Sequence, residues 1–490
     1  MEGGDILKIY ETQIAIIAAG PSGLSAAVQA AQDGAKVILL EKAATIGGAA
    51  NMGMGPLGIG SRYQKEQMID LSVEKAFNMF MDYTHYNVDA RLIKRYFSQS
   101  ADTIAWLEDI GVEFEGAFRY FPQSEATWHI VKTDKGIGPR AASFMNRALY
   151  EKALELGVTV LLEHPVQKIL KKDGKVIGVT AKDPSGEEVR IDCNAAIICT
   201  GGAGANKQMI KEMTGLEHGK TVFNFAIPGV VGDGLKMAWE AGAGRMPVRI
   251  EAAADTGGGE AVTAGVTNIM RQPNLLVNRF GKRIMNEDYM QNTTYLSNVA
   301  CHQKDKVCFS IVDTSIVKYY IKNGVDVTSL VQPDADVSDF YEGIEMVIKN
   351  GSKNYFVADS IEELAEKAGI DVENLRKTID DYNYFCDSRD QEFFKNPKYL
   401  RPLFKPPYYA AAIHPGGYGT VGGVRINENC EACADDYLPI PGLYCAGADS
   451  CNIYDDSYMF LLPGNSMGYA VNTGRIAGMS AANYIKGEEA

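Results

Sequence analysis

The stretch Ile14-Ala-Ile-Ile-Ala-Ala-Gly-Pro-Ser-Gly23 decides the fold of this chain. Its apolar run from Ile14 to Ile17 is typical of a buried parallel strand, and residues 22–34 predict the helix that follows. The turn between them has the pattern G-x-G-x-x-G, with Ala18 in place of the first Gly. We expect this turn to avoid a positive φ at Ala18 or to widen slightly, because a Cβ disfavours that region.

The same stretch predicts a site for an ADP moiety. Small residues let backbone N–H groups approach a pyrophosphate, and the helix N-terminus adds about half a positive charge. A second apolar run, Val37-Ile-Leu-Leu-Glu41, ends in an acid placed to accept hydrogen bonds from ribose hydroxyls. The alternative, small residues present only for packing, is disfavoured by this order of strand, helix, strand and acid.

A second signal lies at the other end of the chain. Ile440-Pro-Gly-Leu-Tyr-Cys-Ala-Gly-Ala-Asp449 is followed by Leu462-Pro-Gly-Asn-Ser-Met-Gly468 and a helix of small residues. We interpret these segments as the site for the far end of the same cofactor. A dinucleotide held by both ends of one chain favours FAD over NAD.

Composition limits the class of protein. The 490 residues allow two or three domains at roughly 150 residues each. A net charge of −14 without a basic run argues against nucleic acid as a partner. No apolar run reaches the roughly 18 residues of a spanning helix, and the first residues, Met1-Glu-Gly-Gly-Asp, do not resemble a targeting leader. We therefore expect a cytoplasmic protein without membrane partners.

The nine cysteines are expected to be reduced thiols. Cys430-Glu-Ala-Cys433 is the one close pair, and a single C-x-x-C without a nearby His is a poor zinc site. We predict a surface hairpin with incidental thiols there, and no metal.

The chain divides by pattern into a split nucleotide-binding domain and an insert. Residues 1–234 form its first part, with a helical excursion at 62–157 and short strands of a meander at 158–162, 167–171, 176–181 and 187–192. Residues 235–355 form a middle domain, and residues 356–490 return to the first. Within the middle domain, 275–287 predicts a hairpin with its turn at 279–282. Asp359-Ser-Ile-Glu-Glu-Leu predicts a capped helix start.

A second Gly-rich turn follows a buried strand in Ala195-Ala-Ile-Ile-Cys-Thr-Gly-Gly-Ala-Gly-Ala-Asn206. No βαβ unit with a terminal acid follows it, so an NAD domain is disfavoured and a turn beside the same FAD is preferred. Gly232-Asp-Gly234 then opens a helix, with Asp233 as a plausible N-cap or cofactor contact.

These motifs, in this order over nearly the whole chain, resemble the FAD-dependent fumarate reductase/succinate dehydrogenase flavoproteins, including soluble urocanate-type reductases and 3-ketosteroid dehydrogenases. Further matches are residues 276–283, 419–424 and Pro463-Gly-Asn-Ser-Met-Gly468. The resemblance implies an α/β fold: a Rossmann-like FAD-binding domain, split in sequence, with an inserted α+β capping domain that faces the isoalloxazine ring.

The resemblance also implies which residues contact FAD. They are Ala19, Gly20, Pro21, Ser22, Gly23, Glu41, Lys42, Gly47, Gly48, Ala49, Ala50, Met54, Gly55, Val166, Thr200, Gly201, Gly202, Asn206, Asp233, Gly447, Ala448, Asp449, Asn465, Ser466 and Met467. Members with covalent FAD place a His after the Gly47-Gly48 loop, whereas this chain has Ala49-Ala-Asn-Met52. FAD is therefore expected to be non-covalent.

The substrate positions depart from the fumarate reductases. The family's His and two Arg fall here on Gly419, Leu461 and Gln291. A dicarboxylate without those cations leaves buried charges unpaired, at several kcal/mol each. We therefore expect a substrate other than fumarate or succinate.

The residues expected around the substrate are neutral and largely aromatic. Tyr289, Gln291, Tyr418, Tyr458, Phe460 and Leu461 are the substrate candidates, with Tyr295 and Tyr454 in neighbouring ligand-facing segments. They favour a neutral, ring-containing substrate with a ketone or phenol as its polar handle. Since the chain has 25 Tyr, we expect most of them to be structural.

The expected reaction is hydride transfer between flavin N5 and a carbon next to an activated carbonyl, as in enone reduction of steroids or plant phenolics such as isoflavonoids. The catalytic candidates are Gly464, whose N–H polarises the substrate oxygen, Tyr418 or Tyr289 as proton donor, and Arg271 as a relay or a surface ion pair. His129 is a weaker donor candidate, more typical of a structural His.

Two alternatives stay open: the reverse, ketosteroid-type dehydrogenation, and an electron-transfer subunit of a larger complex. No haem or iron–sulfur motif is present, so we expect an external electron donor: a reduced flavin, a ferredoxin-like protein or a second substrate molecule.

Overall fold

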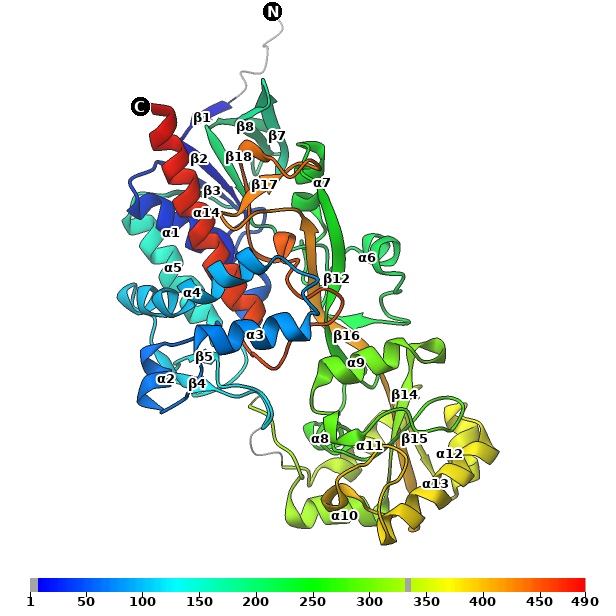
Figure 1. Ribbon diagram of the computed structural model, residues 1–490. Helices are drawn as coiled ribbons and strands as arrows, with labels where there is room; N and C mark the ends of the chain where they lie inside the picture. The colour runs from blue at the N-terminus through cyan, green and yellow to red at the C-terminus, as the bar shows by residue number, and fades with distance from the viewer. Residues whose placement is uncertain (1–7, 331–335, 490) are drawn as a thin grey trace, which may run out of the picture. The chain divides into compact units, whose positions relative to one another are not determined.

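The computed structural model describes residues 8–330 and 336–489, which form two compact units (Figure 1). The first comprises residues 1–214, 226–249 and 419–490, and the second comprises 215–225 and 250–418. The second unit therefore extends well past residue 355, where the sequence pattern placed the end of the insert. The reason is that one long strand, β16 (Tyr408–Val424), pairs with the strands of the second unit before it enters the first.

The core of the first unit is a six-stranded sheet in the order β17-β18-β10-β2-β3-β6. Its strands are β2 (Ile14–Ile17), β3 (Val37–Leu40), β6 (Thr159–Leu161), β10 (Ala195–Ile198), β17 (Glu431–Cys433) and β18 (Pro439–Cys445). All pairs are parallel except β17 with β18. The predicted strands 14–17 and 37–41 are confirmed as buried parallel strands, as is the strand that opens 195–206.

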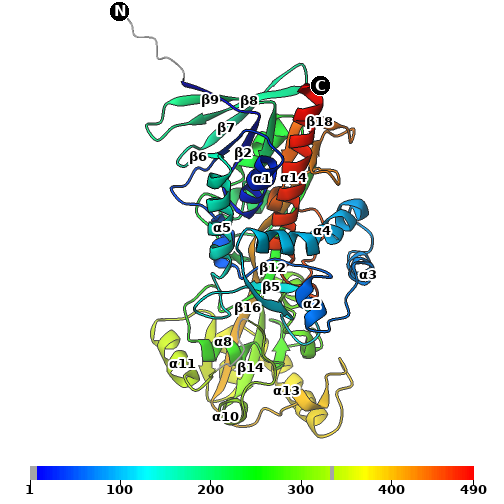
Figure 2. The same ribbon diagram turned by 90° about the vertical axis from the view of Figure 1, so that its left-hand side faces the viewer.

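Helices cover one face of this sheet (Figures 1 and 2). They are α1 (Pro21–Gln32), α4 (Ala90–Asp109), α5 (Ala142–Glu155) and α14 (Asn465–Glu489). The other face packs on α7 (Asp233–Glu240) and on a second sheet, β1-β9-β8-β7. Its strands are β1 (Lys8–Glu11), β7 (Val166–Lys172), β8 (Lys175–Lys182) and β9 (Glu188–Asp192).

Two predictions needed correction here. Residues 159–161 extend the nucleotide-binding sheet instead of joining the meander, because β6 pairs with β3. The excursion at 62–157 is not wholly helical.

The excursion holds a two-stranded sheet besides its helices. The helices include α2 (Arg62–Glu66) and α3 (Val73–Tyr83), and the strands are β4 (Phe114–Phe118) and β5 (Trp128–Val131). β5 also lies against the Gly-rich segment at 54–58, since the Val131 N–H donates to the Met54 carbonyl over 2.9 Å. Small residues there are required: a Cβ on Gly55 would lie 1.9 Å from the His129 carbonyl oxygen.

The second unit is built on the sheet β11-β16-β14-β13, with β12 and β15 also paired to β16. The strands are β11 (Phe223–Asn224), β12 (Arg245–Thr256), β13 (Leu275–Val277), β14 (Cys308–Asp313) and β15 (Tyr355–Ala358). Helices α8 (Ala264–Met270), α9 (Thr293–Cys301), α10 (Thr314–Asn323), α11 (Phe340–Lys349), α12 (Ile361–Ala368) and α13 (Val372–Asp387) complete it, and α6 (Lys207–Thr214) ends the adjoining stretch of the first unit. The predicted cap at Ser360 is confirmed by a bond of 3.1 Å from the Glu363 N–H.

The predicted hairpin at 275–287 is confirmed only at its turn. A turn does form, with the Asn278 N–H bonded to the Lys282 carbonyl over 3.0 Å, but only a single bridge, Val277 to Arg283, closes it. The strand β13 pairs with β14 instead, and residues 287–289 form a 3-10 turn, because Arg283 and Glu287 enter a buried ion-pair cluster.

All nine cysteines are free thiols, as expected. Cys430 and Cys433 are buried, which corrects the surface location predicted for them, because residues 430–433 pack against β18 at the edge of the sheet. Across the described ranges we find no helix able to cross a membrane and no cluster of metal-ligating side chains. The residues inspected for a leader, 1–5, lie outside the described part.

Candidate functional site

The predicted cofactor residues gather at one edge of the first unit's sheet. Parallel strands end at the same edge, and Ala18, Glu41, Cys199 and Ala446 directly follow β2, β3, β10 and β18. In open α/β sheets this carboxyl edge is where ligands bind. Segments far apart in sequence thus meet at one place.

The first turn is tight and strained. Ala18 has a φ of +86°, so the expectation that it avoids the left-handed region was wrong. The turn cannot open because Gly23 packs directly on it: a Cβ there would lie 1.9 Å from the Ala18 carbonyl oxygen. Gly20, at the N-cap of α1, has no side-chain cap and open space beside it, followed by Pro21 and Ser22. The first N–H groups of α1 therefore lack a side-chain cap and suit an anion.

Glu41 is buried and serves the turn directly. Its carboxylate accepts hydrogen bonds from the Ala19 N–H over 2.7 Å and from the Ala43 N–H over 2.8 Å. A carboxylate has further lone pairs, so a ribose hydroxyl can still donate to it. The acid thus fixes the loop as well as offering the predicted contact.

The Gly47-Gly48 loop is tied to the same turn. Gly47 has a φ of +98°, and its N–H donates to the Ala19 carbonyl over 2.7 Å. Asn51 closes the loop from below by donating to the Ile46 carbonyl over 2.8 Å, and it accepts from Asn146 over 2.8 Å. Ala49 and Ala50 lie in the short 3-10 turn at Gly48–Met52, which holds no His.

Asp449 holds the second Gly-rich turn. Its carboxylate is fully buried and accepts bonds from Thr200 Oγ1, the Gly201 N–H and the Gly202 N–H, all at 2.9–3.0 Å. Burial raises the pKa of this carboxyl, and the backbone N–H groups oppose that rise. The β10 and β18 ends are thereby locked together, with Gly447 and Ala448 in the adjoining turn at Gly447–Ser450.

Lys42 and Asp233 pair with each other, Nζ to Oδ2, over 2.6 Å. The N-cap of α7 is Gly232, with a φ of +87°, so the N-cap role predicted for Asp233 was wrong. Asp233 is the first helical residue, where its charge suits the helix dipole.

Among the other candidates, Asn206 caps α6 by accepting from the Met209 N–H over 3.0 Å, and Val166 is buried at the start of β7.

Gly464 precedes α14, which begins at Asn465 as predicted. Its φ is +78°, and its carbonyl accepts bonds from the Leu57 and Gly468 N–H groups, each over 2.8 Å. Ser466 and Met467 are half-buried in the first turn of α14, and the Ser466 N–H donates weakly to Tyr458 Oη over 3.4 Å. Asn465 is buried, and its Nδ2 has no partner among the described residues.

An aromatic cluster, defined as Tyr120, Trp128, Tyr454, Tyr458 and Phe460, packs around the segment before Gly464. Ring centroids lie 4.7 Å apart for Tyr454 and Tyr458, 4.8 Å for Tyr458 and Phe460, and 5.1 Å for Tyr120 and Phe460. The cluster contains no charged side chain. Tyr120 was missed from sequence, and its excursion carries no cofactor motif that points to it.

The remaining candidates belong to the second unit. Tyr289 is exposed and lies 6.5 Å from Tyr295 between ring centroids, and the Gln291 Oε1 is buried without a partner among the described residues. Tyr418 stacks on Phe225 with centroids 5.9 Å apart, a contact that the sequence did not indicate. Arg271 lies at the C-cap of α8. Burial raises the pKa of Asp255, and the positive charge of Arg271 opposes that rise.

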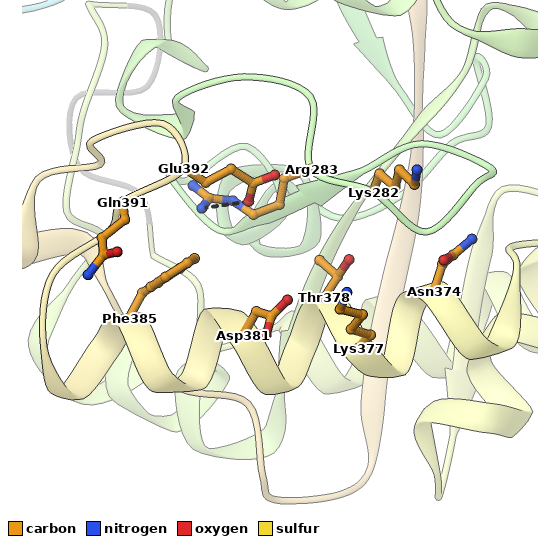
Figure 3. A pocket seen from close by; sticks show the side chains of 9 residues that line it. All are labelled: Lys282, Arg283, Asn374, Lys377, Thr378, Asp381, Phe385, Gln391 and Glu392. Atoms are coloured by element: carbon orange, nitrogen blue, oxygen red, sulfur yellow. Dashed lines mark hydrogen bonds and ion pairs between the residues drawn. The ribbon is translucent and has the colours of Figure 1, made fainter.

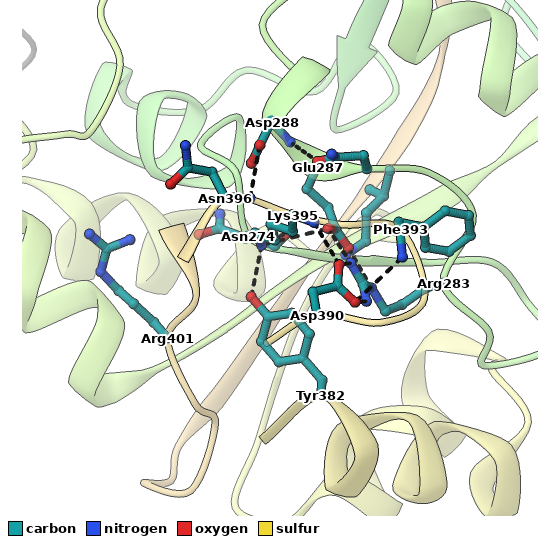
Figure 4. Close-up of polar contacts among 12 residues, drawn as sticks. Asn274, Arg283, Glu287, Asp288, Tyr382, Asp390, Phe393, Lys395, Asn396 and Arg401 are labelled. Atoms are coloured by element: carbon teal, nitrogen blue, oxygen red, sulfur yellow. Dashed lines mark hydrogen bonds and ion pairs between the residues drawn. The ribbon is translucent and has the colours of Figure 1, made fainter. Parts of the chain in front are cut away.

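A buried ion-pair cluster joins the residues just before Tyr289 to residues 382–395 (Figure 4). Arg283 pairs with Glu287 over 2.7 Å and with Asp390 over 2.8 Å, and Lys395 donates to Tyr382 Oη over 2.7 Å. Burial alone would raise the pKa of Asp390, but hydrogen bonds from Arg283 lower it to about 2. The cluster fixes the 3-10 turn at Glu287–Tyr289.

The second unit also contains a cavity of about 500 Å³ (Figure 3). It is lined by Lys282, Arg283, Asn374, Lys377, Thr378, Asp381, Phe385, Gln391 and Glu392. None of these is a predicted site residue, and the lining mixes both signs of charge. We therefore place the functional site at the carboxyl edge of the first unit's sheet.

The residues at that edge fit FAD. The uncapped N-terminus of α1 beside Gly20 suits a pyrophosphate, and Gly474 and Gly478 let α14 approach α1 closely: a Cβ on either would lie within 2.2–2.5 Å of α1 backbone oxygens. The partnerless Asn465 Nδ2 leaves a buried donor at the start of α14, where the far end of the cofactor was expected.

Comparison with known proteins agrees. The profile of the family described as "FAD binding domain" matches residues 13–467. A vinyl phenol reductase of Lactiplantibacillus plantarum is 32% identical over 494 residues, covering 96% of this chain and 96% of that protein. A cytochrome fumarate reductase of Shewanella frigidimarina is 29% identical over 96% of this chain and 77% of that protein.

A solved structure shares the fold. The 3-ketosteroid-delta4-(5alpha)-dehydrogenase of Rhodococcus jostii superposes with a TM-score of 0.76 and 23% identity, covering 98% of each chain. The chain is thus an FAD-dependent oxidoreductase acting on CH–CH groups. It belongs to the FAD binding domain family; the resemblance to fumarate reductases is confirmed in sequence, and the resemblance to ketosteroid dehydrogenases is confirmed in fold.

Proposed function

We propose that this enzyme reduces the carbon–carbon double bond of a neutral alkene conjugated to a hydroxylated aromatic ring, as in 4-vinylphenol. The observation that carries the proposal is the uncharged aromatic cluster beside Gly464, which suits a flat, apolar ring. The likeness to a vinyl phenol reductase over 96% of both chains supports it.

The neutral residues Gly419, Leu461 and Gln291 argue against a dicarboxylate. They occupy the positions where the fumarate reductases are expected to carry His and Arg. Leu461 is half-buried, and its carbonyl accepts from the Glu125 N–H over 2.8 Å. Its aliphatic side chain offers no cation. Burying two unpaired carboxylates costs several kcal/mol each.

The reaction puts negative charge on the substrate's oxygen. FAD, when bound and reduced by the external donor, would supply the hydride. Ionisation of the phenol pushes electrons toward the alkene, so that the outer carbon gains a proton and the ring-bound carbon then accepts the hydride while the phenol regains its proton. The net change is one hydride and one proton added across the double bond. Hydride addition to an enone likewise puts negative charge on the substrate's oxygen, as an enolate.

The protein's part is to hold that oxyanion and to deliver the proton. We assign the first role to the Gly464 N–H, and the second to Tyr418, with Tyr289 as the other candidate. Replacing Tyr418 with Phe should lower kcat by about a hundredfold or more while FAD stays bound, because a general acid contributes that much. Tyr437→Phe, at an exposed position of the first unit, is the control. An unchanged rate for Tyr418→Phe would remove it as the donor.

Electrons are proposed to come from an external donor. Reduced flavin, a ferredoxin-like protein and a second substrate molecule are the candidates. FAD is proposed to be non-covalent, because residues 49–52 offer no His for attachment. Acid precipitation of the holoenzyme should then leave all of the flavin in the supernatant.

Product analysis tests the proposed function. Holoenzyme supplied anaerobically with reduced methyl viologen and 4-vinylphenol should accumulate 4-ethylphenol, whereas fumarate should yield no succinate. Succinate formation without 4-ethylphenol would overturn the proposal. Androst-4-ene-3,17-dione is the comparison substrate for the ketosteroid alternative.

A further inference from the structure

The two peptides that flank the Gly464 Cα are each held by a hydrogen bond from a segment more than three hundred residues earlier in the chain. Thr127 Oγ1 donates to the Pro463 carbonyl over 2.8 Å, and the Leu57 N–H donates to the Gly464 carbonyl over 2.8 Å. Thr127 is fully buried. Its hydroxyl thus holds the Pro463–Gly464 peptide, and the Leu57 N–H holds the Gly464–Asn465 peptide that follows.

This anchoring determines where the Gly464 N–H points. In a trans peptide the N–H and the preceding carbonyl point in opposite directions. In the described chain the one cis peptide bond is Pro406–Pro407, so the Pro463–Gly464 bond is trans. Holding the Pro463 carbonyl on Thr127 therefore directs the Gly464 N–H away from the excursion. No described residue accepts a hydrogen bond from it.

The backbone at this point cannot be replaced by an ordinary residue. Gly464 has a φ of +78°, and a Cβ there would lie 2.7 Å from Trp128 Cδ1 and 2.9 Å from the Leu57 nitrogen. Trp128 and Leu57 therefore pack so closely on Gly464 that there is no room for a side chain at this position. The Thr127 hydroxyl is the one side-chain group in the described structure that bonds to the Pro463 carbonyl.

We propose that Thr127 is a positioning residue: its hydroxyl orients the Pro463–Gly464 peptide so that the Gly464 N–H is presented to the oxyanion of a phenolic substrate. This inference rests on the proposed function. Thr127 acts through Gly464 and does not itself touch the substrate. A preorganised N–H stabilises developing charge because it need not reorient during the reaction.

A purely architectural role for Thr127 is separable from this one. The other contacts of the residue use its backbone, since the Thr127 carbonyl accepts from the Gly58 N–H over 3.0 Å and its N–H donates to the Glu125 carbonyl over 3.0 Å. Thr127→Val keeps the shape and these contacts but removes the hydroxyl. Thr127→Ser keeps the hydroxyl and removes a methyl group.

The test compares both variants as holoenzymes with Thr133→Val, whose hydroxyl bonds to the Gly136 carbonyl elsewhere in the excursion. Thr127→Val should lower kcat for 4-vinylphenol by about tenfold to a hundredfold, with FAD content unchanged. This is less than the roughly hundredfold to thousandfold cost of losing an oxyanion donor, because the Gly464 N–H stays present but is less well oriented. Thr127→Ser and Thr133→Val should stay near wild type. The second readout is the pKa of 4-nitrophenol bound to the oxidised enzyme, followed by its absorption.

Bound 4-nitrophenol should have a lower pKa in the wild type than in water, and Thr127→Val should raise that pKa by about one unit, which is a tenfold change in ionisation. A wild-type kcat and a wild-type probe pKa in Thr127→Val would overturn the inference, as would equal losses in Thr127→Val and Thr127→Ser. If Thr127→Val yields no holoenzyme, Thr127→Ala makes the same comparison. A wild type inactive on 4-vinylphenol would refute the proposed function, while the probe pKa would still decide the role of Thr127.

Discussion

Ala18 shows how one residue stores strain at the start of the cofactor turn. An alanine at a φ of +86° costs about 1–2 kcal/mol compared with a glycine there. The strain persists because Gly23, the Ala19 carbonyl and Glu41 together determine the turn. The pattern in the sequence located this turn correctly but could not show that the replacement Ala would be forced into the left-handed region.

Replacing Ala18 with Gly should therefore stabilise the protein. We expect a gain of up to about 1 kcal/mol in the free energy of unfolding, because relief of strain is partly offset by the greater freedom of Gly in the unfolded chain. The measurement is the urea midpoint of the holoenzyme. Ala19→Gly, at a residue that is not in the left-handed region, is the matched control and should lose stability. A loss in Ala18→Gly as large as that of the control would contradict the strain.

Asp449 shows the limit of assigning roles by motif. The sequence placed it at the cofactor, and the structure shows that its carboxylate holds the Thr200–Gly202 turn with four hydrogen bonds. Glu41 similarly serves the Ala19 turn. Both acids lie at the predicted edge. Their partners Ala19 and Gly201 are more than twenty residues away in sequence, so the motifs alone could not show which groups the carboxylates bond.

At the scale of elements, the strands and helices around the cofactor edge followed from local pattern. Residues 14–17, 37–40 and 195–198 are apolar runs that only a buried parallel strand accommodates, and Asn465 begins a helix as expected. The hairpin at 275–287 stops after a single bridge. Its pattern gives no sign of Asp390 and Lys395, which lie more than a hundred residues away and draw Arg283 and Glu287 into a buried cluster.

The buried cluster predicts a large effect of breaking one ion pair. Arg283→Met leaves Asp390 buried without its cation and Glu287 with only Lys395, 3.7 Å away, and should cost about 3–5 kcal/mol in the free energy of unfolding. Arg376→Met, which removes an exposed pair with Glu362, should cost less than about 1 kcal/mol. Urea unfolding followed by tryptophan and tyrosine fluorescence measures both. Equal, small losses would show that the cluster contributes little.

At the scale of the whole molecule, two buried histidines predict how stability depends on pH. Burial lowers the pKa of His129 to about 4, in the first unit, and of His414 to about 4, in the second. Their unfolded pKa is about 6.5, so the unfolded chain gains protons first as the pH falls. Stability is therefore complete above about pH 6.5 and is lost as the pH falls toward about 4, by up to about 1.4 kcal/mol per pH unit for each His.

The urea midpoint at pH 7.5 and at pH 5 checks this dependence. His129→Gln and His414→Gln should each reduce the difference between the two midpoints, whereas His85→Gln, at an exposed position, should leave it unchanged. If neither buried variant alters the difference, these two histidines do not set the acid limit of stability.

The division of the whole chain was only partly predictable. An insert between two halves of the nucleotide-binding domain was evident from motif order, but its bounds were not, because β12 and β16 are continuous strands that carry no composition shift where one unit gives way to the other. The aromatic cluster was likewise hidden, since Tyr120 and Trp128 come from a segment without motifs and join Tyr458 and Phe460 only on folding.

The most direct test of the account is the rate at which reduced holoenzyme is reoxidised, measured anaerobically by flavin absorbance after mixing with 4-vinylphenol or with fumarate. The account predicts fast reoxidation by 4-vinylphenol and none above background by fumarate. Fast reoxidation by fumarate, with 4-vinylphenol inert, would contradict it.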